Sequence, residues 1–174
     1  MGQLQEEKEV NMKIDLGCGL KKLEGFIGID IGNFEDLYPK DEFIKADVFE
    51  YISKLKENSI EEIFSNQFIE HIPKEKFIGF MNQCYRVLIK EGIFRCIFPP
   101  VINHDGMPNG EFYADPMHVN AILPGTFACF SKEFRDYVYL EDKTDYRGYG
   151  IETDFKPVKA NFINKSQVDI ILKK

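Results

Sequence analysis

Residues 14–31 read IDLGCGLKKLEGFIGIDI, in which two short apolar segments flank a glycine-containing turn. The apolar segments, 12–16 and 26–31, have the length of buried strands and are bounded by turn residues. The two glycines of the turn let the backbone approach a ligand that any Cβ would block. Asp30 ends the second segment, where a carboxylate can accept hydrogen bonds from both hydroxyls of a ribose. The stretch therefore predicts a strand–turn–strand unit that binds a nucleotide-type ligand.

The following residues alternate between strand-length apolar segments and segments of helical periodicity, which is typical of an α/β fold. We expect further strands at 42–46, 60–65 and 93–98, and helices at 48–55 and 74–89, with Glu91-Gly92 ending the second helix. Parallel strands of this kind place their ligands beyond their carboxyl ends. Asp15, Gly17, Gly19, Asp30 and Asp47 all fall at such ends, so they are expected to meet in one crevice.

The C-terminal part is less regular. Residues 99–125 carry Pro99, Pro100, Pro108, Pro116 and Pro124 and fit no periodic pattern, which is typical of a functional or disordered loop. Aromatic residues at 127, 130, 134 and 137 then indicate a helix. Residues 136–140 and 164–172 have the composition of two closing strands, with a loop or distorted hairpin between them.

Composition places the chain among ordinary globular proteins. It has 174 residues, 44% hydrophobic and 29% charged, which suits a single domain with a substantial core. We expect residues 12–174 to form this domain and residues 1–11 to be a disordered polar tail. No apolar run approaches the roughly 18 residues of a membrane helix.

The charge and the cysteines narrow the function classes. The net charge is −7, and the lysines are dispersed among acids, which disfavours a nucleic-acid partner or an anionic membrane surface. The four cysteines form no C-x-x-C pair, so we expect reduced thiols in a cytoplasmic protein. Nothing in the sequence indicates an oligomeric state.

Several motifs in chain order resemble class I SAM-dependent methyltransferases, in particular small stand-alone bacterial and phage proteins. Residues 14–31 resemble the SAM-binding start of that family, and 45–48 (KADV) resemble its adenine-site motif. Residues 65–73 (SNQFIEHIP) resemble the EHIP motif, and 85–99 are similar to the passage from a helix to the fifth strand. His104-Asp105-Gly106 followed by 115–118 (DPMH) resembles the HDG…DPTHV signature of one subgroup.

The resemblance implies a Rossmann-like three-layer sandwich with a mostly parallel seven-stranded sheet and an antiparallel last strand. It also implies S-adenosyl-L-methionine (SAM) as cofactor. Asp30 would hold the ribose hydroxyls, Ile31 and Val48 would lie beside the adenine, and Asp47 would meet its amino group. The methionine part would lie near Asp15, Gly17, Cys18, Gly19 and Asn66.

The chain departs from the usual nucleotide-binding unit between its first two strands. Only thirteen positions separate Gly17 from Asp30, whereas about twenty are usual. Lys21 also stands where a third motif glycine would be. The first crossover helix must therefore be very short or replaced by a turn, which weakens a phosphate-binding interpretation more than SAM binding.

The three histidines are candidates for residues that contact the methyl acceptor. His71 is interpreted as a residue that pins its loop, with shaping of the acceptor side as the functional alternative. His104 and His118, with Asp115, are the candidates for acceptor binding or base catalysis, against a role in turns and caps. His104, Asp105, Asp115 and His118 have the right chemistry for a divalent metal, but their spacing matches no metal motif, so no metal site is predicted.

The sequence thus predicts an enzyme that transfers a methyl group from SAM to a small-molecule or glycan-type acceptor by in-line displacement. The alternative is a non-catalytic methyltransferase-like module that serves as a binding or regulatory subunit. An NAD-type oxidoreductase is disfavoured, because the glycine pattern is incomplete and no room is left for a substrate domain.

Overall fold

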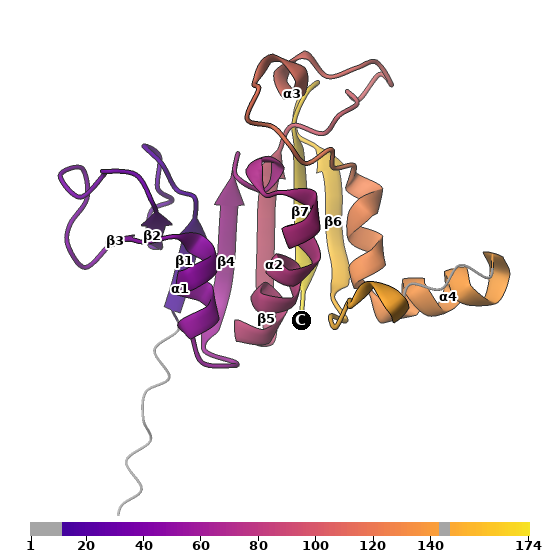
Figure 1. Ribbon diagram of the computed structural model, residues 1–174, viewed down its shortest axis with the longest axis horizontal. Helices are drawn as coiled ribbons and strands as arrows, with labels where there is room; N and C mark the ends of the chain where they lie inside the picture. The colour runs from indigo at the N-terminus through magenta and orange to yellow at the C-terminus, as the bar shows by residue number, and fades with distance from the viewer. Residues whose placement is uncertain (1–11, 143–146) are drawn as a thin grey trace, which may run out of the picture.

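The structure is a computed structural model that describes residues 12–142 and 147–174. These residues form a seven-stranded sheet of order β3-β2-β1-β4-β5-β7-β6 (Figure 1). Neighbouring strands from β3 to β5 pair in parallel, and β7 is antiparallel to both β5 and β6. This confirms the predicted α/β fold and its antiparallel last strand. The strands are β1 (Met12–Leu16), β2 (Ile27–Asp30), β3 (Phe43–Lys45), β4 (Ile60–Asn66), β5 (Leu88–Phe98), β6 (Lys156–Phe162) and β7 (Val168–Lys173). The predicted tail, residues 1–11, lies outside the described residues.

Helices lie in the connections from β3 to β4, from β4 to β5 and from β5 to β6. Asp47 caps α1, because its carboxylate accepts hydrogen bonds from the backbone N–H groups of Phe49 and Glu50 at 2.8 and 3.0 Å. The α-helices are α1 (Val48–Lys54), α2 (Lys74–Val87), α3 (Gly110–Ala114) and α4 (Lys132–Asp142). The 3-10 helices are η1 (Ile69–His71), η2 (Pro124–Phe130) and η3 (Arg147–Tyr149). None of the helices in the described residues is long and apolar enough to span a membrane.

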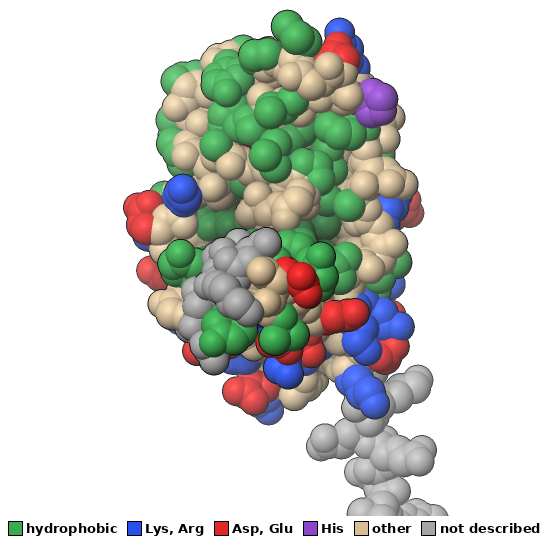
Figure 2. Space-filling view, turned by 90° about the vertical axis from the view of Figure 1, so that its right-hand side faces the viewer, with side chains coloured by type: hydrophobic (Ala, Val, Ile, Leu, Met, Phe, Trp, Pro, Cys, Tyr) green, Lys and Arg blue, Asp and Glu red, His purple; other side chains and the backbone are tan. Residues whose placement is uncertain are grey.

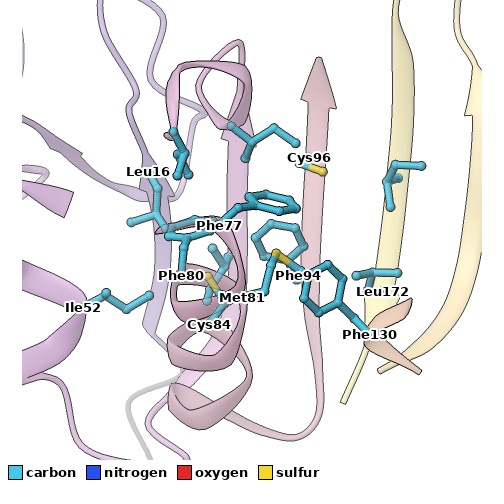
Figure 3. Packing of buried hydrophobic residues seen from close by; sticks show 14 of the residues in the cluster. Leu16, Ile52, Phe77, Phe80, Met81, Cys84, Phe94, Cys96, Phe130 and Leu172 are labelled. Atoms are coloured by element: carbon cyan, nitrogen blue, oxygen red, sulfur yellow. The ribbon is translucent and has the colours of Figure 1, made fainter. Parts of the chain in front are cut away.

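The core lies between α2 and the sheet. The apolar stripe of α2 points towards β1, β4, β5 and β7 (Figure 3). Phe80 packs edge-on against Phe94 of β5 and Phe49 of α1, with ring centroids 6.3 and 5.9 Å apart. Phe130 of η2 covers the other side of the stripe, 5.8 Å from the Phe77 ring. This packing anchors the sheet end that carries the candidate site.

The other face of the sheet lacks helices in its first half. Right-handed connections from β1 to β2 and from β2 to β3 would put helices on the face opposite α1 and α2. In the described chain, residues 17–26 and 31–42 are turns and irregular segments instead. The replacement of the first crossover helix by a turn is therefore confirmed, and the predicted three-layer sandwich is reduced to two layers over β1–β3. Polar pairs such as Lys13–Glu62, 3.2 Å apart, occupy the uncovered face.

Three elements differ from the expectations. Residues 136–140, predicted as a strand, lie in α4, where Val138 is buried while Tyr137 and Tyr139 are exposed, so one-sided packing prevails over strand propensity.

Helix α2 ends at Val87, earlier than predicted, and residues 88–92 begin β5. Glu91 has a φ of 67°, and the pairing register of β4 shifts between Ile60 and Glu62, so β5 passes through a bulge there. The segment expected to be a loop contains β6, which extends the sheet beyond β7.

Residues 99–125 fold over the carboxyl ends of the strands, at the top of Figure 1. Asn109 anchors this segment: its side chain is buried, and its amide donates hydrogen bonds to the carbonyls of Pro100 and Ser166 at 2.8 and 2.7 Å. On the face shown in Figure 2, apolar side chains dominate the upper part and charged side chains surround the lower part. The proline-rich segment is thus an ordered cap at the ligand end of the sheet.

Candidate active site

A cavity of about 370 Å³ opens at the carboxyl ends of β1 to β4, as the strand pattern predicted. Each strand end contributes to its wall. The lining residues are Gly17, Gly19, Asp30, Ile31, Asp47, Val48, Phe49, Gln67, Phe68 and His71. Six of the nine residues predicted to bind the cofactor therefore line one cavity.

The glycine turn after β1 is shaped to leave space above it. Gly17 has a φ of +68°, and a Cβ at this position would lie 2.5 Å from Cγ of Phe68. Any larger residue would be strained in its backbone and would collide with the Phe68 ring. The turn and the ring thus form one wall of the cavity.

Lys22 holds the short connection that replaces the first crossover helix. Its ammonium group, which is almost fully buried, forms an ion pair with Glu42 at 2.9 Å and donates to the carbonyl of Phe26 at 3.0 Å. Tyr38 fixes the same turn, because its hydroxyl donates to the Gly19 carbonyl and accepts from the Lys22 N–H, at 3.0 and 3.1 Å. Side-chain contacts therefore stabilise this connection, which is a helix in the usual nucleotide-binding unit.

Asp30 links the two sides of the cavity. Its Oδ2 accepts a hydrogen bond from the Gly19 N–H at 2.9 Å, and its Oδ1 accepts one from the Gly32 N–H at 2.8 Å. Each carboxylate oxygen has a second lone pair, so Asp30 can still accept two hydroxyl donors. The adjacent Ile31 is 70% exposed and lines the cavity.

Asp47 and Val48 form the wall beyond β3. Only Oδ1 of Asp47 is used in capping α1, which leaves Oδ2 for a ligand amino group. Val48 is buried beside it. Both positions agree with the roles that the resemblance implies.

A second cavity of about 530 Å³ continues from the glycine turn, and Asp15, Cys18 and Asn66 contribute to its lining. Asp15 is buried; its Oδ2 accepts from the Leu23 N–H at 2.8 Å, whereas its Oδ1 has no hydrogen-bond partner among the described residues. Burial raises the pKa of Asp15 to about 6. Burial also raises the pKa of the Cys18 thiol to about 12, so this cysteine is not a nucleophile.

Sequence reasoning missed Gln67, which lies at the centre of the site. Gln67 lines both cavities and a third one of about 490 Å³, which also contains His71, Asp115 and His118. Its φ of 56° is rare for a residue other than glycine, and such strain is concentrated at functional sites. Its position directly after Asn66, the last residue of β4 and a predicted cofactor-binding residue, was the available signal.

The structure brings His118 to His71 and separates it from His104. The rings of His71 and His118 are 4.8 Å apart, and Nε2 of His118 is 3.7 Å from Oδ2 of Asp115. His104 lies in another cavity with Asp105, where its ring contacts Phe162. Of the three candidate catalytic residues, His118 and Asp115 are therefore together beside the main cavity, and His104 is not.

Glu70 is the second residue that sequence reasoning passed over. Its side chain is 0% exposed, and neither carboxylate oxygen has a hydrogen-bond partner among the described residues. Nε2 of His118 lies 4.0 Å from its Oε1. Burial, with a smaller contribution from Asp115, raises the pKa of Glu70 to about 8.

These features define a Rossmann-like protein with an adenosyl-type binding cleft. Gly19 lines the cavity and a Cβ there would project into open space, and the unpartnered Oδ1 of buried Asp15 suits the ammonium group of an amino-acid ligand. Asp30 suits the ribose between them. The cleft therefore fits the parts of SAM, an adenosyl amino acid without phosphates.

Comparison with known proteins agrees with this fit. Residues 26–96 match the model of a family described as a methyltransferase domain. The match begins at the end of the unusual β1–β2 turn, so that turn lies outside it. The search of curated protein sequences finds no significant match.

Solved structures share the fold. A SAM-dependent methyltransferase from Archaeoglobus fulgidus superposes with a TM-score of 0.67 at 18% identity, covering 95% of this chain and 87% of that one. A 1,6-didemethyltoxoflavin-N1-methyltransferase from Burkholderia thailandensis, bound to its substrate and S-adenosylhomocysteine, gives 0.53 at 11% identity, covering 94% and 70%. A phospholethanolamine N-methyltransferase 2 from Haemonchus contortus gives 0.51 at 14% identity, covering 94% and 48%. The chain is therefore similar to a methyltransferase domain over residues 26–96, and it shares the fold of SAM-dependent methyltransferases.

Proposed function

We propose that this chain is a SAM-dependent methyltransferase that acts on a small-molecule acceptor bound in the cavity lined by Gln67, His71, Ala114, Asp115 and His118, among others. The observation that carries the proposal is that Gln67 and His71 line both this cavity and the SAM cleft. A methyl donor in one cavity and an acceptor in the other would meet at these two residues. Residues 12–174 would act together as one domain.

The cofactor-side assignments follow from the two adjoining cavities. Asp30 would accept the ribose hydroxyls, with Ile31 and Val48 against the adenine and Asp47 at its amino group. Asp15 would accept the ammonium group, because it lines the second cavity and its buried Oδ1 has no hydrogen-bond partner among the described residues. Gly17, Cys18, Gly19 and Asn66 would border the methionine chain.

The chain's own residues would supply alignment and a proton acceptor. SAM supplies an electrophilic methyl group whose leaving group is a neutral thioether. Gln67 and His71 would fix the relative position of the two ligands, which is the largest contribution that this chemistry requires. His118 is suited to accept a proton from the acceptor, because its Nδ1 bonds the Phe112 carbonyl at 2.9 Å and its Nε2 keeps a free lone pair.

The size of the acceptor cavity and the chain's charge support a small acceptor over a polymer. The cavity is about 490 Å³, in the range of small-molecule sites. The net charge of −7 opposes binding to nucleic acid. Two fold neighbours were solved with small acceptors or substrates, 1,6-didemethyltoxoflavin and phosphomonomethylethanolamine.

The test is a turnover assay with radiolabelled SAM and a panel of small hydroxyl, carboxyl, amine and sugar compounds. The proposal predicts transfer to at least one compound class and its loss in Gln67→Ala, with S-adenosylhomocysteine binding retained. Binding of S-adenosylhomocysteine without transfer to any compound, together with a stable complex with a second protein, would instead support a regulatory module.

A further inference from the structure

Two histidines and a buried glutamate converge where residues 115–120 cross η1. The ligand atoms of Glu70, His71 and His118 all lie within 4.8 Å of one another. Asp115 adds a second carboxylate, with Oδ2 3.7 Å from Nε2 of His118. We propose that these side chains form a binding site for a divalent first-row transition-metal ion, beside the SAM cleft.

Both imidazoles present a lone pair to the centre of the cluster. Nδ1 of His118 bonds the Phe112 carbonyl at 2.9 Å, and Nδ1 of His71 bonds the Met117 carbonyl at 3.1 Å. A carbonyl oxygen only accepts, so each Nδ1 carries a proton, and in the neutral imidazole the lone pair is then on Nε2. Donation of the distal N–H to a carbonyl is the usual arrangement of a metal-binding histidine.

Glu70 provides an independent indication of a ligand. Its carboxyl group is 0% exposed, and both oxygens lack a hydrogen-bond partner among the described residues. A buried carboxylate without a partner is costly, so it requires a cation or a proton. The backbone fixes its place, because the carbonyl of Glu70 accepts hydrogen bonds from the N–H groups of Val119 and Asn120 at 3.0 and 2.9 Å.

The distances require only a small contraction. Two donors that are each about 2.1 Å from one ion can be at most about 4.2 Å apart. The separation of His118 Nε2 from Glu70 Oε1 is 4.0 Å, within that limit. The widest separation in the cluster, up to 4.8 Å, must close by roughly half an ångström. Side-chain rotations of His71 and Glu70 supply such a change.

The donor set selects the type of metal. Two imidazole nitrogens with one or two carboxylates suit ions such as Zn²⁺, Co²⁺ or Fe²⁺, whereas Mg²⁺ prefers oxygen ligands. The spacing of the residues predicts no metal site, and the sequence offers His104 and Asp105 as the residues that could bind a metal together with His118. The structure replaces those two residues with Glu70 and His71, which lie 33 residues or more away from them in the chain.

A metal ion here would define the acceptor as an oxygen compound, and this role rests on the proposed function. An acceptor hydroxyl that coordinates the ion would have a lowered pKa and would release its proton to the buffer. With the ion bound, Nε2 of His118 would be a ligand, so His118 would not also accept the proton. Its oxygen then forms the bond to the methyl carbon, while the carbon–sulfur bond breaks and sulfur keeps the electron pair as a neutral thioether. The metal site itself does not depend on this step.

The test is titration of the tag-free protein with Co²⁺ alone, followed by visible absorption and calorimetry, with Mg²⁺ as a comparison. We expect one Co²⁺ per chain with a micromolar or lower Kd, displacement by Zn²⁺, and much weaker Mg²⁺ binding. His118→Ala and Glu70→Gln should each weaken Co²⁺ binding at least about tenfold. His104→Ala is the matched control, because it removes an imidazole from the same segment outside the cluster, and it should bind Co²⁺ like the unchanged protein.

Two results would overturn the metal site: no stoichiometric Co²⁺ binding, or binding that His118→Ala and Glu70→Gln leave unchanged. Circular dichroism of each variant verifies folding, and the near-isosteric Glu70→Gln keeps the test valid if His118→Ala is unfolded. Binding of S-adenosylhomocysteine is measured on the same samples. If S-adenosylhomocysteine does not bind while Co²⁺ does, the proposed function is contradicted and the metal site is not. If S-adenosylhomocysteine binds while Co²⁺ does not, the metal site is contradicted and the proposed function is not.

Discussion

Replacement of Asp30 by Asn tests the ribose assignment. The variant keeps the shape of the side chain but loses its charge and one acceptor oxygen. A hydrogen bond to a charged group contributes about 1.5–3 kcal/mol. At most one ribose hydroxyl would keep an acceptor, so we expect a loss of about 2–4 kcal/mol, or a Kd for SAM raised about 30- to 1,000-fold.

The variant also affects the fold, and the assay must separate the two effects. An amide NH₂ would face the N–H of Gly19 or Gly32, each of which now donates to Asp30, so a stability loss of about 1–3 kcal/mol is expected. Urea unfolding measures this loss of stability. Calorimetry with SAM and S-adenosylhomocysteine is then performed under conditions where the variant is folded. Asp36→Asn is the control, because it removes the same charge from an exposed position outside the cavity lining. A folded Asp30→Asn variant that binds as tightly as the Asp36→Asn control would refute the assignment.

Three further predictions concern stability. Gly17→Ala should destabilise more than Gly25→Ala, by about 1–3 kcal/mol in urea unfolding, because both have positive φ but only the first meets a neighbour, Phe68; equal losses would contradict the steric argument. Between pH values near 4 and 6 the folded protein should bind more protons than the unfolded chain at Asp15, whose pKa is raised to about 6. The unfolding free energy should therefore fall as pH rises through this window, by at most about 3 kcal/mol. Asp15→Asn should remove the part of the fall that is due to Asp15, whereas the part due to Glu70, whose pKa is raised to about 8, should remain. Identical pH profiles for the two proteins would be inconsistent with a raised pKa of Asp15. Phe80→Ala, which empties the centre of the aromatic core, should cost about 3–5 kcal/mol, and a loss below about 1 kcal/mol would show that the core repacks.

The features that sequence predicted well are local ones. Gly17, Asp30 and Asp47 each follow a strand directly, so the strand pattern alone places them at one edge of the sheet. Their hydrogen bonds to nearby backbone groups fix the side chains without help from distant segments. The strand–turn–strand pattern was therefore sufficient to predict that these three residues line one cavity.

The acceptor side depends on how the long segment folds back. His118 meets His71 because Asn109 anchors the segment and because two backbone N–H groups bond the carbonyl of Glu70. These contacts join residues about 50 positions apart, and no periodicity reports them. The prediction of a strand at residues 136–140 was wrong for a related reason. Packing on one face of α4 prevailed over the strand propensity of their β-branched and aromatic side chains.

The most direct test is a crystal structure of the protein with S-adenosylhomocysteine. We expect the ribose hydroxyls within hydrogen-bond distance of the Asp30 carboxylate, the adenine between Ile31 and Val48, and the amino group of the homocysteine at Oδ1 of Asp15. A ligand bound elsewhere, or an Asp30 carboxylate turned away from the ribose, would contradict the account.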